Sequence, residues 1–325
     1  MIQLFYNKMG ESLSNIVFLG NFRVDYTSES HHARSLEELG HNVIRMQESE
    51  ARSEDILAAC LSSDLFIWIH THGWETQGKI SMEKLLQTLK TLSIPSMTYH
   101  LDLWFGLQRQ KDLESFPVYK MIDHFFTVDS QMANWFNEKT EVKGHYLPAG
   151  VFGPECTIRD VTKKHDVLFV GSKKYHPEWP YRPKLIDWLD KTYGNRFEHY
   201  GNGGVRSIRG LGLNKLYWST KVVVGDTLCI DFNYPDYWSD RIYETLGRGG
   251  FLIHPYVPGL EKEFTDREHV VFYEYNNFEQ LQQLIDYYIE NDDEREKIRL
   301  AGHSLVKSNY TYKHRWQKIL EDLGI

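Results

Sequence analysis

The sequence predicts an α/β protein made of two domains, each a parallel sheet with helices on both faces. Short apolar runs suited to buried strands alternate with amphipathic stretches suited to helices along most of the chain. One polar, irregular stretch, residues 152–165, interrupts this alternation. The 325 residues suffice for two domains of ordinary size. We therefore expect an N-terminal domain over 1–150, a second domain over 165–310 and a final helix over 311–325.

The first half contains five apolar runs that we interpret as strands, separated by helical patterns. The expected strands are 16–20, 42–46, 65–69, 95–99 and 125–128, and the expected helices are 31–39, 53–62, 80–92 and 130–138. The loop after the first strand lacks the Gly-x-Gly-x-x-Gly pattern, so a dinucleotide fingerprint is missing.

The second half repeats the alternation. The expected strands are 166–172, 197–200, 222–225, 251–254 and 270–273, and the expected helices are 182–193, 214–219, 258–264 and 278–290. Between the third and fourth of these strands we expect a short helix that begins at Ser239 as N-cap and stops at Gly249-Gly250.

Composition excludes several classes of protein. The 37 basic and 45 acidic residues give a net charge of −8, which disfavours wholesale coating of nucleic acid or anionic membrane. Three cysteines, far apart and in no Cys-x-x-Cys pair, indicate reduced thiols in a cytoplasmic protein. We find no signal peptide at the start and no apolar run near the ~20 residues that span a bilayer.

The segment 236–255 carries the strongest chemical signal. A helix start with free N–H groups beside Arg241 suits an anion, and Glu244 one turn further could accept hydrogen bonds from two neighbouring sugar hydroxyls. Ile242 and Leu246 would face the core on the opposite side. The alternative is a surface ion pair between Arg241 and Glu244 on an ordinary helix.

The pattern Arg-x-x-Glu-(small)-Leu-x-x-Gly-Gly-Phe-Leu in this segment resembles the donor-binding motif of GT-B glycosyltransferases, and is most similar to the CgeB-like, group 1 branch. The resemblance implies two Rossmann-like domains facing a cleft, with the C-terminal helix crossing back to the first domain. It also implies that Glu244 holds the ribose of a nucleotide sugar such as a UDP-sugar. Asp236 stands where many retaining members carry a catalytic Glu, and this departure leaves its role open.

Ligands of open α/β sheets bind at the carboxyl ends of the strands, and this rule selects further donor-site candidates. Glycines let the backbone approach a phosphate, and Lys or Arg neutralises its charge. The predicted donor-binding residues are Gly171, Ser172, Lys173, Gly201, Asn202, Arg206, Ser239, Arg241 and Glu244. The alternative is that the cations among them are solvated loop residues.

In the first half the same rule selects candidates for the acceptor side. Asp102 and His72 are plausible bases for an acceptor hydroxyl, unless each merely binds a loop or a substrate hydroxyl. Asn21, Trp74 and Trp104 are expected to bind the acceptor, although the tryptophans could equally pack in a core. His70, His72 and Asp102 invite a metal site, but no motif supplies a third His or Cys, and we expect none.

The sequence thus predicts a cytoplasmic, metal-independent hexosyl- or pentosyltransferase that needs no cofactor besides its nucleotide-diphosphate sugar. The acceptor hydroxyl could belong to a glycan, a protein, a small molecule or, against the net charge, a modified nucleic acid. Three alternatives stay open: a nucleotide-sugar epimerase on the same fold, a non-catalytic sugar-nucleotide-binding module, and a metal-dependent hydrolase.

Overall fold

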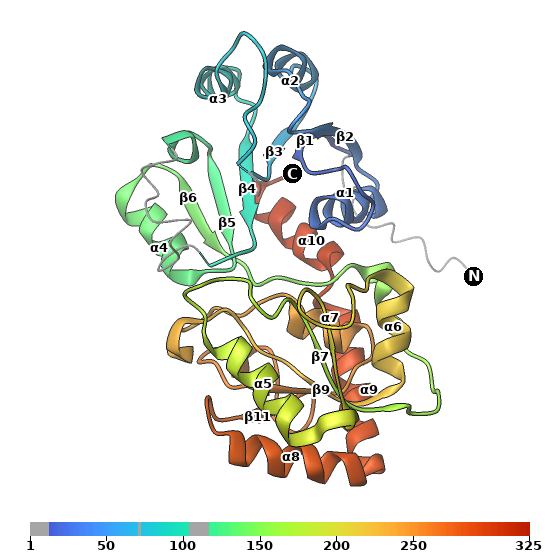
Figure 1. The fold of residues 1–325 in the computed structure, drawn as a ribbon. Helices are drawn as coiled ribbons and strands as arrows, with labels where there is room; N and C mark the ends of the chain where they lie inside the picture. Colours follow the sequence, from blue (N-terminus) through green and yellow to red (C-terminus); the bar gives the residue numbers. More distant parts are fainter. Residues whose placement is uncertain (1–12, 71–72, 104–116) are drawn as a thin grey trace, which may run out of the picture. The chain divides into compact units, whose positions relative to one another are not determined.

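The computed structural model describes residues 13–70, 73–103 and 117–325, which form two sheets covered by helices (Figure 1). The first sheet has the strand order β2-β1-β3-β4-β5-β6 and the second β11-β10-β9-β7-β8. β1 pairs in parallel with β2 and β3, and β7 pairs in parallel with β8 and β9. The predicted α/β architecture with two parallel-strand sheets is confirmed.

The strands of the first sheet are β1 (Asn15–Gly20), β2 (Asn42–Gln47), β3 (Leu65–Trp68), β4 (Ser96–His100), β5 (His124–Thr127) and β6 (Lys143–Tyr146). Those of the second sheet are β7 (His165–Val170), β8 (Phe197–Tyr200), β9 (Thr220–Val224), β10 (Leu252–Pro255) and β11 (Val271–Tyr273). The α-helices are α1 (Ser28–Glu38), α2 (Ser53–Cys60), α3 (Met82–Thr91), α4 (Ser130–Lys139), α5 (Tyr181–Tyr193), α6 (Gly210–Trp218), α7 (Arg241–Gly247), α8 (Phe278–Glu290), α9 (Asp292–Asn309) and α10 (Tyr312–Leu323).

The contacts within the chain divide it into two compact units. One comprises Met1–Thr98, Met121–His124 and Trp316–Ile325, and the other comprises Tyr99–Lys120 and Phe125–Arg315. Most of α10 therefore groups with the first part of the chain. Within that unit Trp316 is fully buried, and its Nε1–H donates to Nδ1 of His32 at 3.1 Å.

Among the elements that differ from the sequence prediction are α1, β6 and residues 258–264. α1 begins at Ser28 rather than near residue 31, because the Thr27 hydroxyl caps the helix by accepting from the Ser30 N–H at 3.1 Å. β6 was not predicted, since its sequence Lys-Gly-His-Tyr contains no apolar run and it forms the edge of its sheet. Residues 258–264 form only a 3-10 turn, Leu260–Lys262, because Pro258 and the left-handed Gly259 (φ 105°) precede it.

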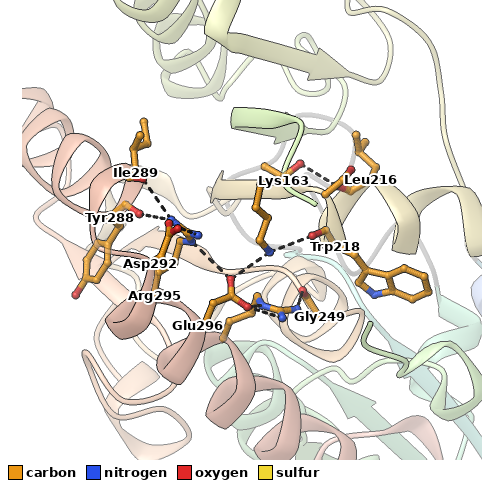
Figure 2. A network of polar contacts seen from close by, with 12 residues as sticks. Lys163, Leu216, Trp218, Gly249, Tyr288, Ile289, Asp292, Arg295 and Glu296 are labelled. Atoms are coloured by element: carbon orange, nitrogen blue, oxygen red, sulfur yellow. Dashed lines mark hydrogen bonds and ion pairs between the residues drawn. The ribbon is translucent and has the colours of Figure 1, made fainter. Parts of the chain in front are cut away.

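A polar network in the second unit joins the segment before β7 to α9 (Figure 2). Glu296 of α9 pairs with Lys163 Nζ at 3.1 Å and with Arg299 Nη2 at 2.5 Å. The Lys163 ammonium also donates to the carbonyl of Trp218, at the end of α6, at 3.0 Å. The network thereby fixes three segments around the base of the second sheet.

Among the described residues, no helix is both long and apolar enough to cross a membrane.

Candidate functional site

The second sheet has a topological switch point between β7 and β9. The chain goes from β7 outward to β8, then returns to the other side of β7 to form β9. The loops after β7 and β9 therefore diverge, and a crevice between such loops is the usual ligand site of an open α/β sheet. Gly171 follows β7 and Asp226 follows β9 at this point.

Two glycines allow close backbone approach beside β7. A Cβ on Gly171 (φ 155°) would lie 2.7 Å from Nη1 of Arg241, and one on Gly201 (φ 135°) would lie 2.4 Å from the Gly171 carbonyl oxygen. The Arg241 guanidinium, which comes from α7, donates to the carbonyl of Val170 at the end of β7. Arg241 and Gly171, far apart in sequence, are thus brought together at the switch point.

Arg241 stays cationic in this position. Burial would lower the pKa of its guanidinium, but the carboxylates of Asp226, Asp240 and Glu244 outweigh that effect and raise it. Asp226 is itself fully buried and accepts from Nε of Arg182 at 2.7 Å. Two arginines and their carboxylates therefore form the charged floor of the crevice.

Glu244 has the most available carboxylate of this group. Its side chain is 33% exposed, and its nearest cation is Arg248, whose Nη2 lies 3.7 Å away. Arg248 is 2% exposed and already binds Glu155 and, at 2.7 Å, Oδ1 of Asn214. The surface ion pair between Arg241 and Glu244 does not form among the described residues, so that alternative is wrong.

The start of α7 differs from its prediction. The helix begins at Arg241 with Asp240 at the N-cap position, and Ser239 is not the cap. The Ser239 N–H donates to Oγ1 of Thr227 at 2.9 Å, and its buried Oγ has no hydrogen-bond partner in the described part of the chain. The loop after β9 therefore holds Ser239 by its backbone, outside the helix.

Asp240 is a site residue that the sequence analysis missed. Burial first, and the neighbouring Glu244 second, raise the pKa of its carboxyl to about 7, against a partly opposing effect of Arg241. A carboxyl that titrates near neutrality in a crevice is suited to proton transfer or to sensing a bound anion. Its only sequence signal was its place directly before Arg241.

The remaining donor candidates lie on the β7 and β8 loops. The Lys173 N–H donates to the Asn202 carbonyl at 2.9 Å, which joins the two loops beside Ser172. The Lys173 ammonium pairs with Asp187 on α5. Arg206 is exposed, and its backbone carbonyl accepts from the Gly201 N–H at 2.9 Å. The structure brings together Gly171, Ser172, Lys173, Gly201 and Asn202, whereas in the described part of the chain no hydrogen bond or ion pair links the Arg206 side chain to them.

Asp236 lies in the loop before α7, with a left-handed backbone (φ 55°). Its Oδ1 accepts from Nζ of Lys262 at 2.7 Å, and a Cβ on Gly259 would lie 2.2 Å from the same oxygen. The carboxylate is thus packed against the loop that follows β10.

Two acceptor candidates of the first unit flank Arg23. The Asn21 side-chain oxygen accepts from the Arg23 N–H at 3.3 Å, and the Arg23 guanidinium lies 5.0 Å from the ring centroid of Trp74. His72 and Trp104 lie outside the described residues. Asp102 follows β4, and its negative charge contributes to the raised pKa of Asp240 in the same compact unit.

The first sheet holds a carboxylate–imidazole pair that was also missed. Glu48, directly after β2, is 1% exposed, accepts from Nε1 of Trp68 at 2.7 Å and pairs with Nδ1 of His70. Within the described ranges, no group of three or more His, Cys, Asp or Glu residues could hold a metal ion.

Known proteins resemble this chain in part of its sequence and in its fold. Residues 178–321 match a family described as glycosyl transferase-like. The matched stretch includes Arg182, Asp226, Arg241 and Glu244. Among curated proteins, no sequence matches the chain.

Solved structures share the fold over nearly the whole chain. A glycosyltransferase from Rickettsia africae is 14% identical with a TM-score of 0.64, covering 95% of this chain and 97% of that one. Anabaena Alr3699/HepE, solved with UDP-glucose, is 10% identical with a TM-score of 0.63, and the match covers 96% of this chain and 99% of that one. An α-glucosyltransferase solved with UDP-glucose and DNA is 9% identical with a TM-score of 0.66, covering 96% and 100%. These likenesses confirm the predicted GT-B fold.

Proposed function

We infer that this protein transfers a sugar from a nucleotide-diphosphate donor to an acceptor hydroxyl. The observation that carries this function is the placement of Arg241 against Gly171 at the switch point, with the partly exposed Glu244 one turn away. A guanidinium beside a glycine can meet a phosphate closely, and a carboxylate can accept from two ribose hydroxyls.

We propose that Arg241, with the backbone of the Gly171 and Gly201 loops, binds the donor diphosphate. Arg182 and Asp226 act beneath it as positioning residues, because their buried pair fixes the floor of the crevice. Ser172, Lys173 and Asn202 would border the donor on the β8 side. UDP is the nucleotide that we favour for the donor, because HepE and the α-glucosyltransferase were both solved with UDP-glucose.

On the acceptor side we propose Asp102 as the base that takes the hydroxyl proton, with His72 as the next candidate. Asp236 would act on the donor sugar, and Asn21, Trp74 and Trp104 would contact the acceptor. We favour a glycan, a protein or a small molecule over DNA, because a net charge of −8 repels a polyanion.

We propose that the reaction needs no metal, since Arg241 supplies positive charge where the diphosphate would bind. The CgeB-like branch is our proposed place within the family, supported by the Arg241 to Leu252 motif. A cytoplasmic setting is supported by Cys60, Cys156 and Cys229, which are all buried free thiols.

A turnover assay tests the function. Purified protein is incubated with a panel of UDP- and GDP-sugars, with and without an array of hydroxyl acceptors, and free nucleotide diphosphate is measured. We expect release that depends on acceptor and persists in EDTA. Nucleotide binding without any turnover would favour a non-catalytic module, and an isomerised donor without acceptor would favour an epimerase.

A further inference from the structure

A second pocket lies at the carboxyl ends of β10 and β11, and the proposed donor site does not use it. Its volume is about 650 Å³, and its lining includes neither Arg241 nor Glu244 nor Gly171. It is walled mainly by aromatic rings from three segments, namely Phe232, Tyr256, Phe264, Phe272, Tyr273 and Tyr275. A pocket of this size fits a small organic molecule.

The rings form two ordered pairs. Tyr256 and Phe272 meet edge to face, with centroids 5.9 Å apart at 73°. Phe232 and Tyr275 stack with centroids 4.2 Å apart at 30°. Aromatic faces carry negative charge density, so a ring face that lines a pocket attracts a cation.

The charges of the lining have one sign. Asp231, Glu261, Asp266 and Glu274 line the pocket, and its lining residues include no Lys or Arg. Two cations neighbour these acids: Arg267, whose Nε lies 3.8 Å from Asp266 and whose side chain is 55% exposed, and Lys262, whose charge helps to lower the pKa of Glu261. A phosphate group would be repelled here, whereas an ammonium group would be attracted.

Hydrogen bonds fix two of these carboxylates, Glu261 and Asp266, in place. Glu261 accepts from the Tyr256 hydroxyl and from the Gly259 N–H, both at 2.9 Å. Asp266 accepts from the Phe272 N–H at 2.8 Å. Glu261 and Asp266 are therefore held against the residues of the pocket wall.

The backbone beside the pocket is strained. Asp231 and Phe232 are consecutive non-glycine residues with left-handed φ angles of 54° and 52°. Such strain persists where packing enforces it and gathers at binding sites. Phe232 is 4% exposed and packs on Trp179, Tyr181 and Tyr275, while Asp231 is exposed at the pocket.

We propose that this pocket binds a small organic ammonium ion, by cation–π contact with its rings and charge pairing with its acids. The lining omits Arg241, Glu244 and Gly171 of the proposed donor site, and the proposal does not depend on the glycosyl transfer proposed above. The pocket adjoins the loop of Asp236, whose N–H donates to the carbonyl of the lining residue Pro258 at 2.8 Å. The ligand class is a compact amine or quaternary ammonium group on a small organic body, and phosphate-bearing molecules are excluded.

Calorimetry with choline and its neutral isostere 3,3-dimethylbutan-1-ol tests the proposal on the full chain. We expect choline to bind at millimolar concentration and the isostere to bind about tenfold more weakly, within the range of a cation–π contact. Asp231→Asn should weaken choline severalfold, because Asn tolerates the left-handed backbone and removes only the charge. Tyr256→Leu should also weaken choline, without changing UDP-glucose affinity.

The matched control is Asp293→Asn, an exposed carboxylate in the first turn of α9. It should leave choline affinity unchanged. The proposal is overturned if choline does not bind, if the neutral isostere binds as tightly, or if Asp231→Asn and Asp293→Asn behave alike while both variants melt at the wild-type temperature.

Discussion

Arg182 and Asp226 form a buried ion pair at the switch point of the second sheet, with Arg182 Nε 2.7 Å from Asp226 Oδ2 and side-chain exposures of 3% and 0%. The indole N–H of Trp179 lies 3.4 Å from the same carboxylate oxygen. A buried pair contributes little by itself, but removing one partner leaves an uncompensated charge. Arg182→Met should therefore cost about 3–5 kcal/mol of unfolding free energy, measured by urea titration.

The double variant Arg182→Met, Asp226→Asn provides the control. It should recover part of the lost stability, because the buried charge is gone. If Arg182→Met alone unfolds at the wild-type urea midpoint, the pair does not fix the crevice floor.

Glu244→Gln should weaken ribonucleotide binding about tenfold with little change in melting temperature. The carboxylate can accept from two vicinal hydroxyls, whereas the amide has one accepting oxygen. Stability should hold, because Glu244 is 33% exposed and its Arg248 contact is a distant 3.7 Å. Calorimetry measures the affinity of wild type and Glu244→Gln for UDP and for 2′-deoxy-UDP. The substitution should lower the affinity for 2′-deoxy-UDP less than the affinity for UDP.

Glu290→Gln, an exposed change at the end of α8, is the matched control for this experiment. It should leave UDP affinity unchanged. Equal UDP affinities in wild type and Glu244→Gln would falsify the ribose assignment.

Asp240 should make donor binding depend on pH. Its folded pKa of about 7, against 3.8 for the ordinary carboxyl, means that the folded state holds an extra proton between these values. Its contribution to stability therefore falls as pH rises from about 4 to about 7. A bound diphosphate would favour the protonated carboxyl further, so UDP-glucose affinity should fall between about pH 6 and about pH 8.

Calorimetry across this pH range measures the effect, because UDP-glucose has no phosphate group that titrates near neutrality. Asp240→Asn should flatten the profile while it keeps binding. A profile with the same slope in that variant would remove Asp240 from the donor site.

Asp102→Asn should lower turnover far more than donor affinity. A general base contributes ~10²–10⁴-fold to the rate, and the amide cannot take the proton. Steady-state kinetics with UDP-sugar, beside UDP calorimetry, separates the two effects. Near-normal turnover would transfer the role to His72 or to a donor phosphate oxygen.

The fold could be predicted because most strands are buried apolar runs, and such runs are visible in sequence. β6 escaped prediction because an edge strand needs only pairing with β5, which its own polar residues do not reveal. Arg241 and Glu244 were found through one local motif. The raised pKa of Asp240 depends on burial by distant segments, and Arg182 reaches Asp226 across 44 positions, so neither leaves a local pattern.

The network around Glu296 should make stability depend on pH at the acidic end (Figure 2). Burial would raise the pKa of this carboxyl, but Arg299 and Lys163 outweigh it and lower the pKa below 4.5. The contribution of the Glu296 carboxylate to the free energy of unfolding is therefore complete above about pH 4.5. It is lost as the pH falls through the lower pKa of the folded state. Glu296→Gln should lower the free energy of unfolding by about 1–3 kcal/mol at neutral pH. This cost is smaller than that of breaking a fully buried ion pair, because the Glu296 side chain is 29% exposed.

Urea unfolding of wild type, Glu296→Gln and Glu290→Gln at several pH values measures this dependence. In Glu296→Gln the cations Lys163 and Arg299 lose their carboxylate partner, whereas Arg295 keeps its ion pair with the exposed Asp292, so the cost at neutral pH should stay within about 1–3 kcal/mol. The difference from wild type should shrink as the solution is acidified below about pH 4.5, because the wild-type carboxyl then takes up a proton. Glu290→Gln should follow wild type throughout. A Glu296→Gln deficit that stays constant down to the acid transition would show that the side chain acts by packing rather than by its charge.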